Sequence, residues 1–347
     1  METQKTRGVM TDQHDYSLLR HNTFGIEAHC ARFLEYASEE EACQIASLLK
    51  DHTEPLLILG GGSNLLLTAD FPGTVVHSAV KGFDVVQEDD DTIVLRVGSG
   101  ELWDDVVARC VSNGWYGTEN LSLIPGEAGA SAVQNIGAYG AEAATIINKV
   151  EAVSLADGHV CTFDAADCQY GYRQSRFKHE WKNRYLITHV CYRLSKTFRP
   201  LLDYGNIRSE LERQGISDPT AAQLREVIIG IRREKLPDPE VEGNAGSFFM
   251  NPIVECGTYD RLCQQWPNMP HYRLADGRVK IPAGWMIDQC GWKGRSLGPA
   301  GVHDKQALVL VNLGGASGQD ILRLCQRIQH DVKEKFGIDI QPEVNIR

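Results

Sequence analysis

The sequence predicts an α+β protein of two or three domains, and three observations support this prediction. The chain has 347 residues, which is enough for more than one sizeable core. Its hydrophobic content of 42% and charged content of 23% are typical of an ordinary globular protein. Short apolar runs that end in glycine turns alternate irregularly with helical patterns, so strands and helices are mixed along the chain.

The charge and the ends of the chain exclude several classes of partner. The net charge of −11 offers no basic face for nucleic acid, so an anionic small substrate would need locally placed Arg and Lys. No apolar run approaches the roughly 20 residues of a membrane span. The first residues have no apolar core, so we expect neither a signal peptide nor an anchor, and we interpret residues 1–20 as a poorly ordered tail.

The ten cysteines are scattered, without a C-x-x-C pair or zinc-finger spacing. Several occupy apolar periodic positions, where a reduced thiol acts as a small hydrophobe. We therefore expect a reducing cytoplasm and no structural metal.

Hydrophobic spacing and capping residues define the expected elements in order. Helices are predicted at 39–50, 101–113, 220–235, 258–266, 283–289 and 318–336, and strands at 74–77, 92–98, 184–194 and 307–312. Apolar residues that include Leu102 line the second helix, and Pro237 stops the third, close to a domain boundary. A hairpin at 149–163 is expected to turn on Asp157-Gly158 as a type I′ turn. Ser317 and Asp320 open the last helix as a capping box, and an alternating strand is expected from Ile338 to the end.

Two glycine-rich segments suggest a ligand site. The first, PLLILGGGSNLLL (55–67), predicts strand, glycine turn and strand; it is neither a Walker A loop nor a G-x-G-x-x-G fingerprint. The second, IPGEAGASAVQNIGAYG (124–140), has a backbone almost free of bulky side chains. Such backbones can present N–H groups to a diphosphate, and the amides of Gln134 and Asn135 suit a flat ring system. A plain hairpin and a long glycine-rich turn are the alternatives.

Three further residues could carry chemistry. Arg173 lies between tyrosines in QYGYRQS, where a guanidinium could be held against a carboxylate; the alternative is a solvated loop arginine. Ser247 lies between Gly246 and a Phe-Phe pair that we assign to the core, and no G-x-S-x-G elbow surrounds it, so a proton donor is favoured over a hydrolytic nucleophile. Glu343 lies on the polar face of the last strand, where a solvent-exposed carboxylate is the alternative.

These motifs together resemble the UDP-N-acetylenolpyruvoylglucosamine reductase (MurB) family of peptidoglycan synthesis. The resemblance runs from Asn22 to the end, through NTFGI, LILGGGSN, ENLSLIPG, QNIGAYG, GYRQSRFK, KLPDP, GNAGSFF-x-NP, AGWMIDQCGWKG, H-x-x-x-AL-x-L-x-N and PEV in that order. The stretch 269–285 resembles the tyrosine-bearing loop of the longer subtype of this family.

The resemblance implies a two-part FAD-binding module of the vanillyl-alcohol-oxidase (PCMH) type with a C-terminal α/β substrate domain. The implied boundaries are a flexible tail at 1–20, a first FAD-binding subdomain at 21–79, a second at 80–232 completed by 338–347, and a substrate domain at 233–337.

The resemblance also implies the reaction and its cofactors. NADPH would reduce a non-covalent FAD, and the reduced flavin would deliver hydride to C3 of the enolpyruvyl ether of UDP-N-acetylglucosamine enolpyruvate, with a proton added at C2. Ser247 would donate that proton, while Arg173 and Glu343 would polarise the substrate carboxylate and stabilise the enolate.

The resemblance also implies which residues bind the cofactor and the substrate, because they stand at positions that match the family's motifs. The FAD contacts are Gly60, Gly61, Gly62, Ser63, Asn64, Ile124, Pro125, Gly126, Gly129, Ala130, Ser131, Gln134, Asn135, Ile136 and Gly137. The contacts to the UDP-sugar or the nicotinamide nucleotide are Tyr204, Arg232, Lys235, Asn251, Tyr272, Lys293 and Gln306, and no metal is implied.

The chain departs from the family pattern at two places: Ala132 replaces a usual proline, and Glu127 brings a carboxylate beside the expected diphosphate, from which we expect it to point away. A monomeric cytoplasmic enzyme is expected. A carbohydrate or alcohol oxidase on the same fold and a non-catalytic nucleotide-sugar-binding protein are the competing interpretations.

Overall fold

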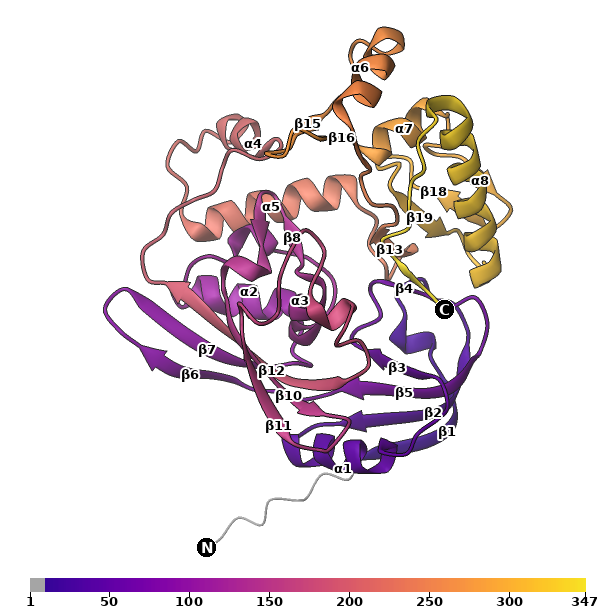
Figure 1. Ribbon diagram of the computed structural model, residues 1–347. Helices are drawn as coiled ribbons and strands as arrows, with labels where there is room; N and C mark the ends of the chain where they lie inside the picture. The colour runs from indigo at the N-terminus through magenta and orange to yellow at the C-terminus, as the bar shows by residue number, and fades with distance from the viewer. Residues whose placement is uncertain (1–9) are drawn as a thin grey trace, which may run out of the picture. The chain divides into compact units, whose positions relative to one another are not determined.

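The computed structural model describes residues 10–347, which fold as two compact units (Figure 1). Unit 1 contains residues 10–16, 30–61 and 72–232, and unit 2 contains residues 17–29, 62–71 and 233–347. Part of the predicted tail is therefore ordered. Residues 1–9 lie outside the described residues, but Thr11–Ser17 forms strand β1 at the edge of a sheet, where Asp12 accepts two hydrogen bonds from Arg32 and Tyr16 stacks on Phe33.

Unit 1 is built on two sheets. The first has the order β1-β2-β5-β3, and the second has the order β11-β10-β12-β7-β6 (Figure 1). Their strands are β2 (His29–Tyr36), β3 (Leu56–Leu59), β5 (Phe71–Ser78), β6 (Phe83–Glu88), β7 (Thr92–Gly98), β10 (Ile147–Ser154), β11 (Val160–Asp164) and β12 (Tyr185–Ser195). The helices are α1 (Glu39–Leu49), α2 (Trp103–Ser112), α3 (Ala128–Gln134), α4 (Ile207–Arg213) and α5 (Ala221–Lys235), and a short hairpin joins β8 (Gly137–Ala138) to β9 (Ala141–Glu142).

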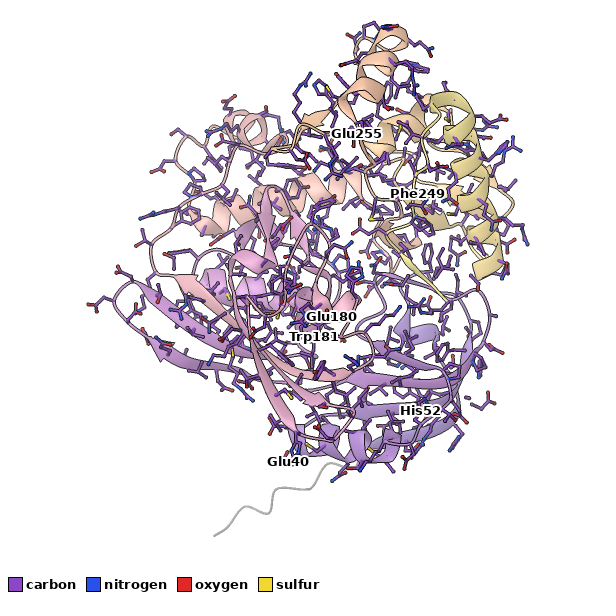
Figure 2. All side chains as sticks on the ribbon, in the orientation of Figure 1. Glu40, His52, Glu180, Trp181, Phe249 and Glu255 are labelled. Atoms are coloured by element: carbon purple, nitrogen blue, oxygen red, sulfur yellow. The ribbon has the colours of Figure 1, made fainter. Side chains whose placement is uncertain are left out.

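Apolar residues at the predicted spacings hold unit 1 together. Helices α2 and α3 bury one face against β7, β10 and β12, while α1 packs against residues of β2, β5, β10 and β12. Trp181 (Figure 2) lies in an aromatic group with Phe163, Phe177 and Tyr185, whose ring centroids are 4.4–5.6 Å from its own. Helix α1 therefore packs against strands of both sheets and joins them in one unit.

Unit 2 is a mixed sheet and helix unit. Its four-stranded sheet has the order β13-β19-β18-β17, a three-stranded sheet has the order β14-β16-β15, and β20 pairs in parallel with β4. The strands are β4 (Leu65–Leu66), β13 (Gly243–Ser247), β14 (Ile253–Val254), β15 (Tyr272–Arg273), β16 (Val279–Lys280), β17 (Ser296–Leu297), β18 (Ala300–Val302), β19 (Val309–Asn312) and β20 (Asn345–Ile346). The helices are α6 (Cys256–Gln265), α7 (Ala283–Gln289) and α8 (Gly318–Phe336).

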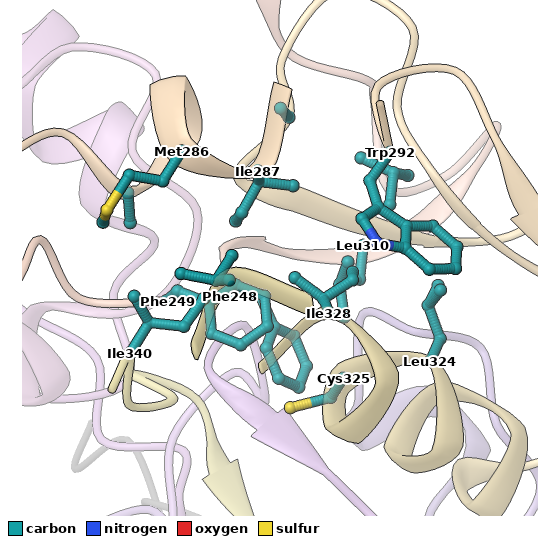
Figure 3. Packing of buried hydrophobic residues seen from close by; sticks show 14 of the residues in the cluster. Phe248, Phe249, Met286, Ile287, Trp292, Leu310, Leu324, Cys325, Ile328 and Ile340 are labelled. Carbon is teal, nitrogen blue, oxygen red and sulfur yellow. The ribbon is translucent and has the colours of Figure 1, made fainter. Parts of the chain in front are cut away.

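The core of unit 2 contains the Phe-Phe pair that the sequence assigned to it. Phe248 and Phe249 are 0% and 1% exposed and pack with residues of α7, α8 and β19 (Figure 3). Helix α8 carries the predicted capping box, in which Ser317 accepts from the Asp320 N–H and Asp320 accepts from the Ser317 N–H, and it ends at Gly337 with φ 70°.

Three local predictions were wrong. Helix α2 begins at Trp103, so Leu102 is exposed and the Trp103 ring takes the core position, with its Nε1 donating to the Leu121 carbonyl. The β10–β11 connection has a positive φ at Gly158 but not at Asp157, so it is not a type I′ turn. The C-terminal segment keeps its alternating burial at Ile338 and Ile340, but only Asn345–Ile346 is a strand, because Pro342 has no N–H with which to continue a ladder.

The two units group the chain differently from the boundaries expected above. Residues 338–347 belong with 233–337, because the C-terminal residues pair with β4 of the same unit. The ten cysteines all lie in the described part of the chain, and none forms a disulfide. Among residues 10–347, no group of His, Cys, Asp and Glu could hold a metal ion, and no helix is long and apolar enough to cross a membrane.

Candidate functional site

The two glycine-rich segments that the sequence singled out meet in unit 1. A Cβ atom placed on Gly61 would lie 3.5 Å from the Cα of Gly126, and one on Gly60 would lie 3.4 Å from the Cβ of Ala130. The turn after β3 therefore packs directly against the segment that leads into α3. Bulkier residues at these positions would push the two segments apart.

The turn at Gly60–Gly62 has the backbone that a phosphate cradle requires. Gly62 has a φ of +66°, and an added Cβ would lie 1.9 Å from the carbonyl oxygen of His21. Within the described part of the chain, the N–H groups of Gly60, Gly61 and Gly62 have no hydrogen-bond acceptor. Unpaired donors on a bulk-free turn fit the diphosphate of FAD.

The segment 124–140 is only partly a loop, so it differs from the long glycine-rich turn that was the alternative interpretation. Residues 128–134 form helix α3, and Asn135 ends it in the left-handed conformation with φ 45°. The segment is held at its entry, where Leu123 has a φ of +56°. The Leu123 N–H donates to Asp104, its carbonyl accepts from Arg232 Nε, and Asp104 also accepts two hydrogen bonds from Arg225.

Several of the residues predicted to contact FAD also make hydrogen bonds or close contacts within the protein. Asn135 uses its side-chain amide inside the protein: Nδ2 donates to Glu142 and to the Gly171 carbonyl, and Oδ1 accepts from the Ala144 N–H. Ser131 is fully buried, and its hydroxyl bonds to the Ala128 carbonyl and the Tyr192 hydroxyl. Gly129 is needed because a Cβ there would lie 2.8 Å from the Cβ of Ser99. The other predicted contacts are Ser63 and Asn64 in unit 2 and Ile124, Pro125, Ala130, Gln134 and Ile136 in unit 1.

The structure brings Arg173 onto the same segment. Arg173 has a φ of +55°, and its guanidinium donates to the carbonyls of Asn135 and Gly137. A Cβ on Gly137 would lie 2.8 Å from Arg173 Nη1, so the glycine permits this approach. The ring of Tyr172 lies 5.2 Å from the guanidinium carbon. Arg173 is therefore a positioned cation rather than a solvated loop arginine.

Ser247 and Glu343 lie on adjoining backbone in unit 2. The Glu343 N–H donates to the Phe248 carbonyl at 2.8 Å, and Phe249 forms a bridge with Pro342. Ser247 is exposed, next to Gly246 with φ +68° and the buried phenylalanines. The Glu343 carbonyl also accepts from the side chain of Asn64. The sequence could not show this proximity, because the two residues are far apart along the chain.

The predicted substrate contacts fall into two groups. In unit 1, Tyr204 lies 3.4 Å from the Cβ position of Gly140, and both Tyr204 and Arg232 interact with Tyr139. In unit 2, Asn251 accepts from the Ala283 N–H at the start of α7, and Gln306 lies against Gly284 of the same helix. Tyr272 is exposed on β15 with the Lys280 ammonium 5.4 Å from its ring, and Lys235 and Lys293 are exposed.

A buried charged group at the first glycine turn was missed. His77 Nδ1 lies 2.8 Å from Glu35 Oε2, and His77 Nε2 lies 3.1 Å from Glu127 Oε1. Burial alone would lower the pKa of His77, but its hydrogen bonds to Glu127 and Glu35 raise it to about 9. No spacing in the sequence joins three residues on β2, β5 and the segment before α3.

The position of Glu127 corrects the expectation that it points away from the diphosphate turn. Its carboxylate lies against that turn: Oε2 is 3.4 Å from the Cβ position of Gly60, and Cγ is 3.7 Å from that of Gly61. A positively charged His77 beside it makes this arrangement tolerable, since a buried carboxylate is costly without a partner.

The raised pKa of His77 predicts a pH-dependent stability. A protonated His77 stabilises the folded protein fully below the ordinary value of 6.5, and this stabilisation is lost as the pH rises through about 9. Urea unfolding of the wild type and His77→Gln between these two pH values measures it. We expect the wild type to lose more unfolding free energy than the variant across this window, and equal pH slopes would contradict the assignment.

Comparison with known proteins supports a flavin-binding class. A family model described as an FAD binding domain matches residues 30–164, and one described as the UDP-N-acetylenolpyruvoylglucosamine reductase C-terminal domain matches residues 238–347. The fold is similar to the crystal structure of the Thermus caldophilus reductase (MurB), with a TM-score of 0.67 and 22% identity over 97% of this chain and 98% of that chain. A solvent-stable cholesterol oxidase matches 99% of this chain and 88% of its own with a TM-score of 0.50 and 11% identity. The FAD-binding family model, together with the names of the relatives given next, places the chain among FAD-dependent oxidoreductases.

Relatives of known name identify the family. The chain is 55% identical to the UDP-N-acetylenolpyruvoylglucosamine reductase of Bacteroides fragilis over 96% of this chain and 99% of the relative. It is 47% identical to the enzyme of the same name from Pseudomonas aeruginosa over 96% of this chain and 98% of that relative. The chain belongs to the UDP-N-acetylenolpyruvoylglucosamine reductase family.

Proposed function

We propose that this chain catalyses the NADPH-dependent reduction of UDP-N-acetylglucosamine enolpyruvate to UDP-N-acetylmuramate, a step of peptidoglycan precursor synthesis, with non-covalently bound FAD. The observation that supports this most directly is the packing of the Gly60–Gly61 turn against Gly126 and Ala130. It brings two bulk-free segments together at unpaired N–H donors that suit a diphosphate. Neither glycine segment contains a histidine or cysteine for covalent attachment of the flavin.

FAD held at the glycine turns would supply redox chemistry, in which hydride from NADPH reaches C3 of the enolpyruvyl group. The new C–H bond at C3 moves the electron pair of the double bond to C2, where the substrate carboxylate delocalises it. Ser247 Oγ then gives its proton to C2, which completes the addition of hydride and proton. An exposed hydroxyl beside the left-handed Gly246 and the rigid Phe-Phe pair is suited to this transfer.

Arg173 and Glu343 are proposed to stabilise the charge that develops on the substrate carboxylate. Arg173 is held by two carbonyls, so it needs little reorganisation to meet a developing negative charge. The backbone of Glu343 is held by hydrogen bonds to the Phe248 carbonyl and to the Asn64 side chain, so the Cα atom that carries its side chain has a fixed position. In its protonated form this carboxyl group can donate a hydrogen bond.

The remaining predicted residues are proposed to bind the UDP-sugar or the nicotinamide nucleotide. They are Tyr204, Arg232, Lys235, Asn251, Tyr272, Lys293 and Gln306. These cations and hydroxyl groups supply local attraction for an anionic substrate in a chain of net charge −11. A monomer in the cytoplasm, with neither nucleic acid nor membrane as a partner, is part of the proposal.

An anaerobic two-step experiment tests the reaction. The flavin of the purified protein is reduced with NADPH until its band at ~450 nm is bleached, and UDP-N-acetylglucosamine enolpyruvate is then added without oxygen. Rapid return of the band is the expected result. A band that stays bleached until air is admitted would overturn the substrate assignment and favour an oxidase, and a colourless protein that takes up no FAD would favour a non-catalytic binding protein.

A further inference from the structure

Glu35, His77 and Glu127 form a cluster at the predicted diphosphate turn, which we call the carboxylate–histidine cluster; His77 and Glu127 are buried and Glu35 is partly exposed. His77 lies between the two carboxylates, at 2.8 Å from Glu35 and 3.1 Å from Glu127. The side chains of His77 and Glu127 are each 10% exposed. With His77 protonated, two carboxylates and one imidazolium leave a net charge of −1 at this place.

The fold places the cluster at the turn. His77 lies near the end of β5, in register with Leu59 of the neighbouring parallel strand β3, and Gly60 follows Leu59 directly. Glu35 lies on β2, the other neighbour of β5. The ring of Phe33 stacks on His77 with a centroid distance of 6.3 Å. The imidazole is thus fixed by strand pairing and by packing, and it holds Oε1 of Glu127 in one place.

The second oxygen of Glu127 has no partner. Oε2 is buried, and no donor reaches it within residues 10–347. It faces the Gly60 turn, 3.4 Å from where a Cβ of residue 60 would lie, so the glycine leaves space in front of it. A buried acceptor without a donor costs about 1–3 kcal/mol, and more when it is charged. Glu127 does not cap α3 either, because it makes no side-chain capping hydrogen bond.

The chemistry of the ligand proposed for this turn supplies the missing donor. The phosphate oxygens of a dinucleotide are acceptors and would repel a carboxylate, but hydroxyl groups lie on both sides of its diphosphate. A carboxylate accepts strongly from a hydroxyl. We propose that Glu127 Oε2 accepts a hydrogen bond from a sugar hydroxyl of the bound flavin dinucleotide, and that His77 is a positioning residue that holds this carboxylate and offsets its charge beside the diphosphate. The proposal rests on the FAD site proposed above and extends its donor and acceptor set.

FAD affinity and protein stability are measured separately to test it. Apo-protein is titrated with FAD by the quenching of flavin fluorescence, and the melting temperature of the same apo-protein is recorded. We expect Glu127→Ala to weaken FAD binding about 10-fold or more, the effect of losing one charge-assisted hydrogen bond. Its apo-protein melts at a lower temperature as well, because the ion pair with His77 is lost. Glu35→Ala removes the other carboxylate partner of His77 but no proposed flavin contact, so it should lower the melting temperature and keep most of the FAD affinity. An unchanged Kd in Glu127→Ala would overturn the proposal, as would equal losses of affinity in the two variants, which would mark a purely structural role.

A double-variant comparison isolates the role of His77. His77→Gln alone leaves two carboxylates beside the turn without a cation, so we expect it to weaken FAD binding more than the double variant His77→Gln with Glu127→Ala. Additive losses would overturn the positioning role. Where a variant apo-protein fails to fold, the rate of FAD release from its holoprotein on dilution gives the same comparison.

Two smaller probes identify the hydroxyl. The affinities of the wild type and of Glu127→Ala are measured for FMN and for ADP. If the variant binds FMN more weakly than the wild type does, the hydroxyl donor lies on the ribityl chain; if it binds ADP more weakly, the donor lies on the adenosine ribose. If the variant binds both probes as well as the wild type does, the hydroxyl assignment is overturned. Wild-type apo-protein that fails to bind FAD would refute the proposed function itself, so the two failures are distinguishable.

Discussion

Replacing Ser247 with alanine is expected to leave the reduction of FAD by NADPH intact and to slow the reoxidation of reduced flavin by the enolpyruvyl substrate by about 10²- to 10⁴-fold. The hydroxyl is the proposed proton donor to C2, and alanine has no proton to give. Hydride transfer from NADPH does not need that proton. Anaerobic stopped-flow measurement of each half-reaction separates the two effects.

The structure provides a check that the variant keeps its fold. Ser247 is exposed, so the loss of one hydroxyl should not change the packing of Phe248 and Phe249 beneath it. Ser296→Ala, another exposed strand serine of unit 2, is the matched control and should reoxidise at the wild-type rate. Normal rates for both half-reactions in Ser247→Ala would remove the serine from the proton-transfer step.

Replacing Gly62 with alanine is expected to abolish tight FAD binding and to destabilise the protein. A Cβ at this position would lie 1.9 Å from the His21 carbonyl, a main-chain atom that cannot move aside without the segment around it. The φ of +66° adds about 1–2 kcal/mol for a residue other than glycine. The turn must therefore shift, and its N–H donors shift with it. The flavin content of the purified variant and its urea unfolding curve measure both effects.

Gly215→Ala is the matched control for backbone strain alone. Gly215 has a φ of +72°, and nothing lies within 4 Å of its Cβ position. It should lose about 1–2 kcal/mol of stability and keep its flavin. If Gly62→Ala behaves like Gly215→Ala, the turn is more adaptable than its geometry indicates, and the proposed phosphate cradle loses its support.

The sequence was informative wherever one residue type is required by local backbone. Three consecutive glycines between apolar runs predicted a turn that only glycine permits, and Gly62 occupies such a conformation. The capping box of α8 was predicted correctly for the same reason, since it depends on neighbours in the chain. The Phe-Phe pair was assigned to the core from its apolar character, and the structure confirms that assignment. The family was recognised from ten such local motifs in order.

Local pattern was misleading where burial or pairing depends on distant residues. Leu102 has the apolar character of a core position, but Trp103 fills that position because its indole reaches the Leu121 carbonyl. The C-terminal alternation predicted a long strand, but Pro342 makes only an isolated bridge with Phe249, and a strand forms at Asn345–Ile346 where it pairs with Leu65 and Leu66. The internal partners of the Asn135 amide, which are Glu142, Gly171 and Ala144, were likewise not predictable from the local pattern.

The sequence by itself therefore determined the family, the glycine turns and the types of residue available for the chemistry. Only the tertiary structure decided which of them are neighbours: Gly61 against Gly126, Arg173 on the Asn135–Gly137 backbone, and Glu127 beside His77. The physical reason is that backbone conformation is set within a few residues. Charge pairing and close packing instead depend on strand register and helix packing between segments far apart in the chain.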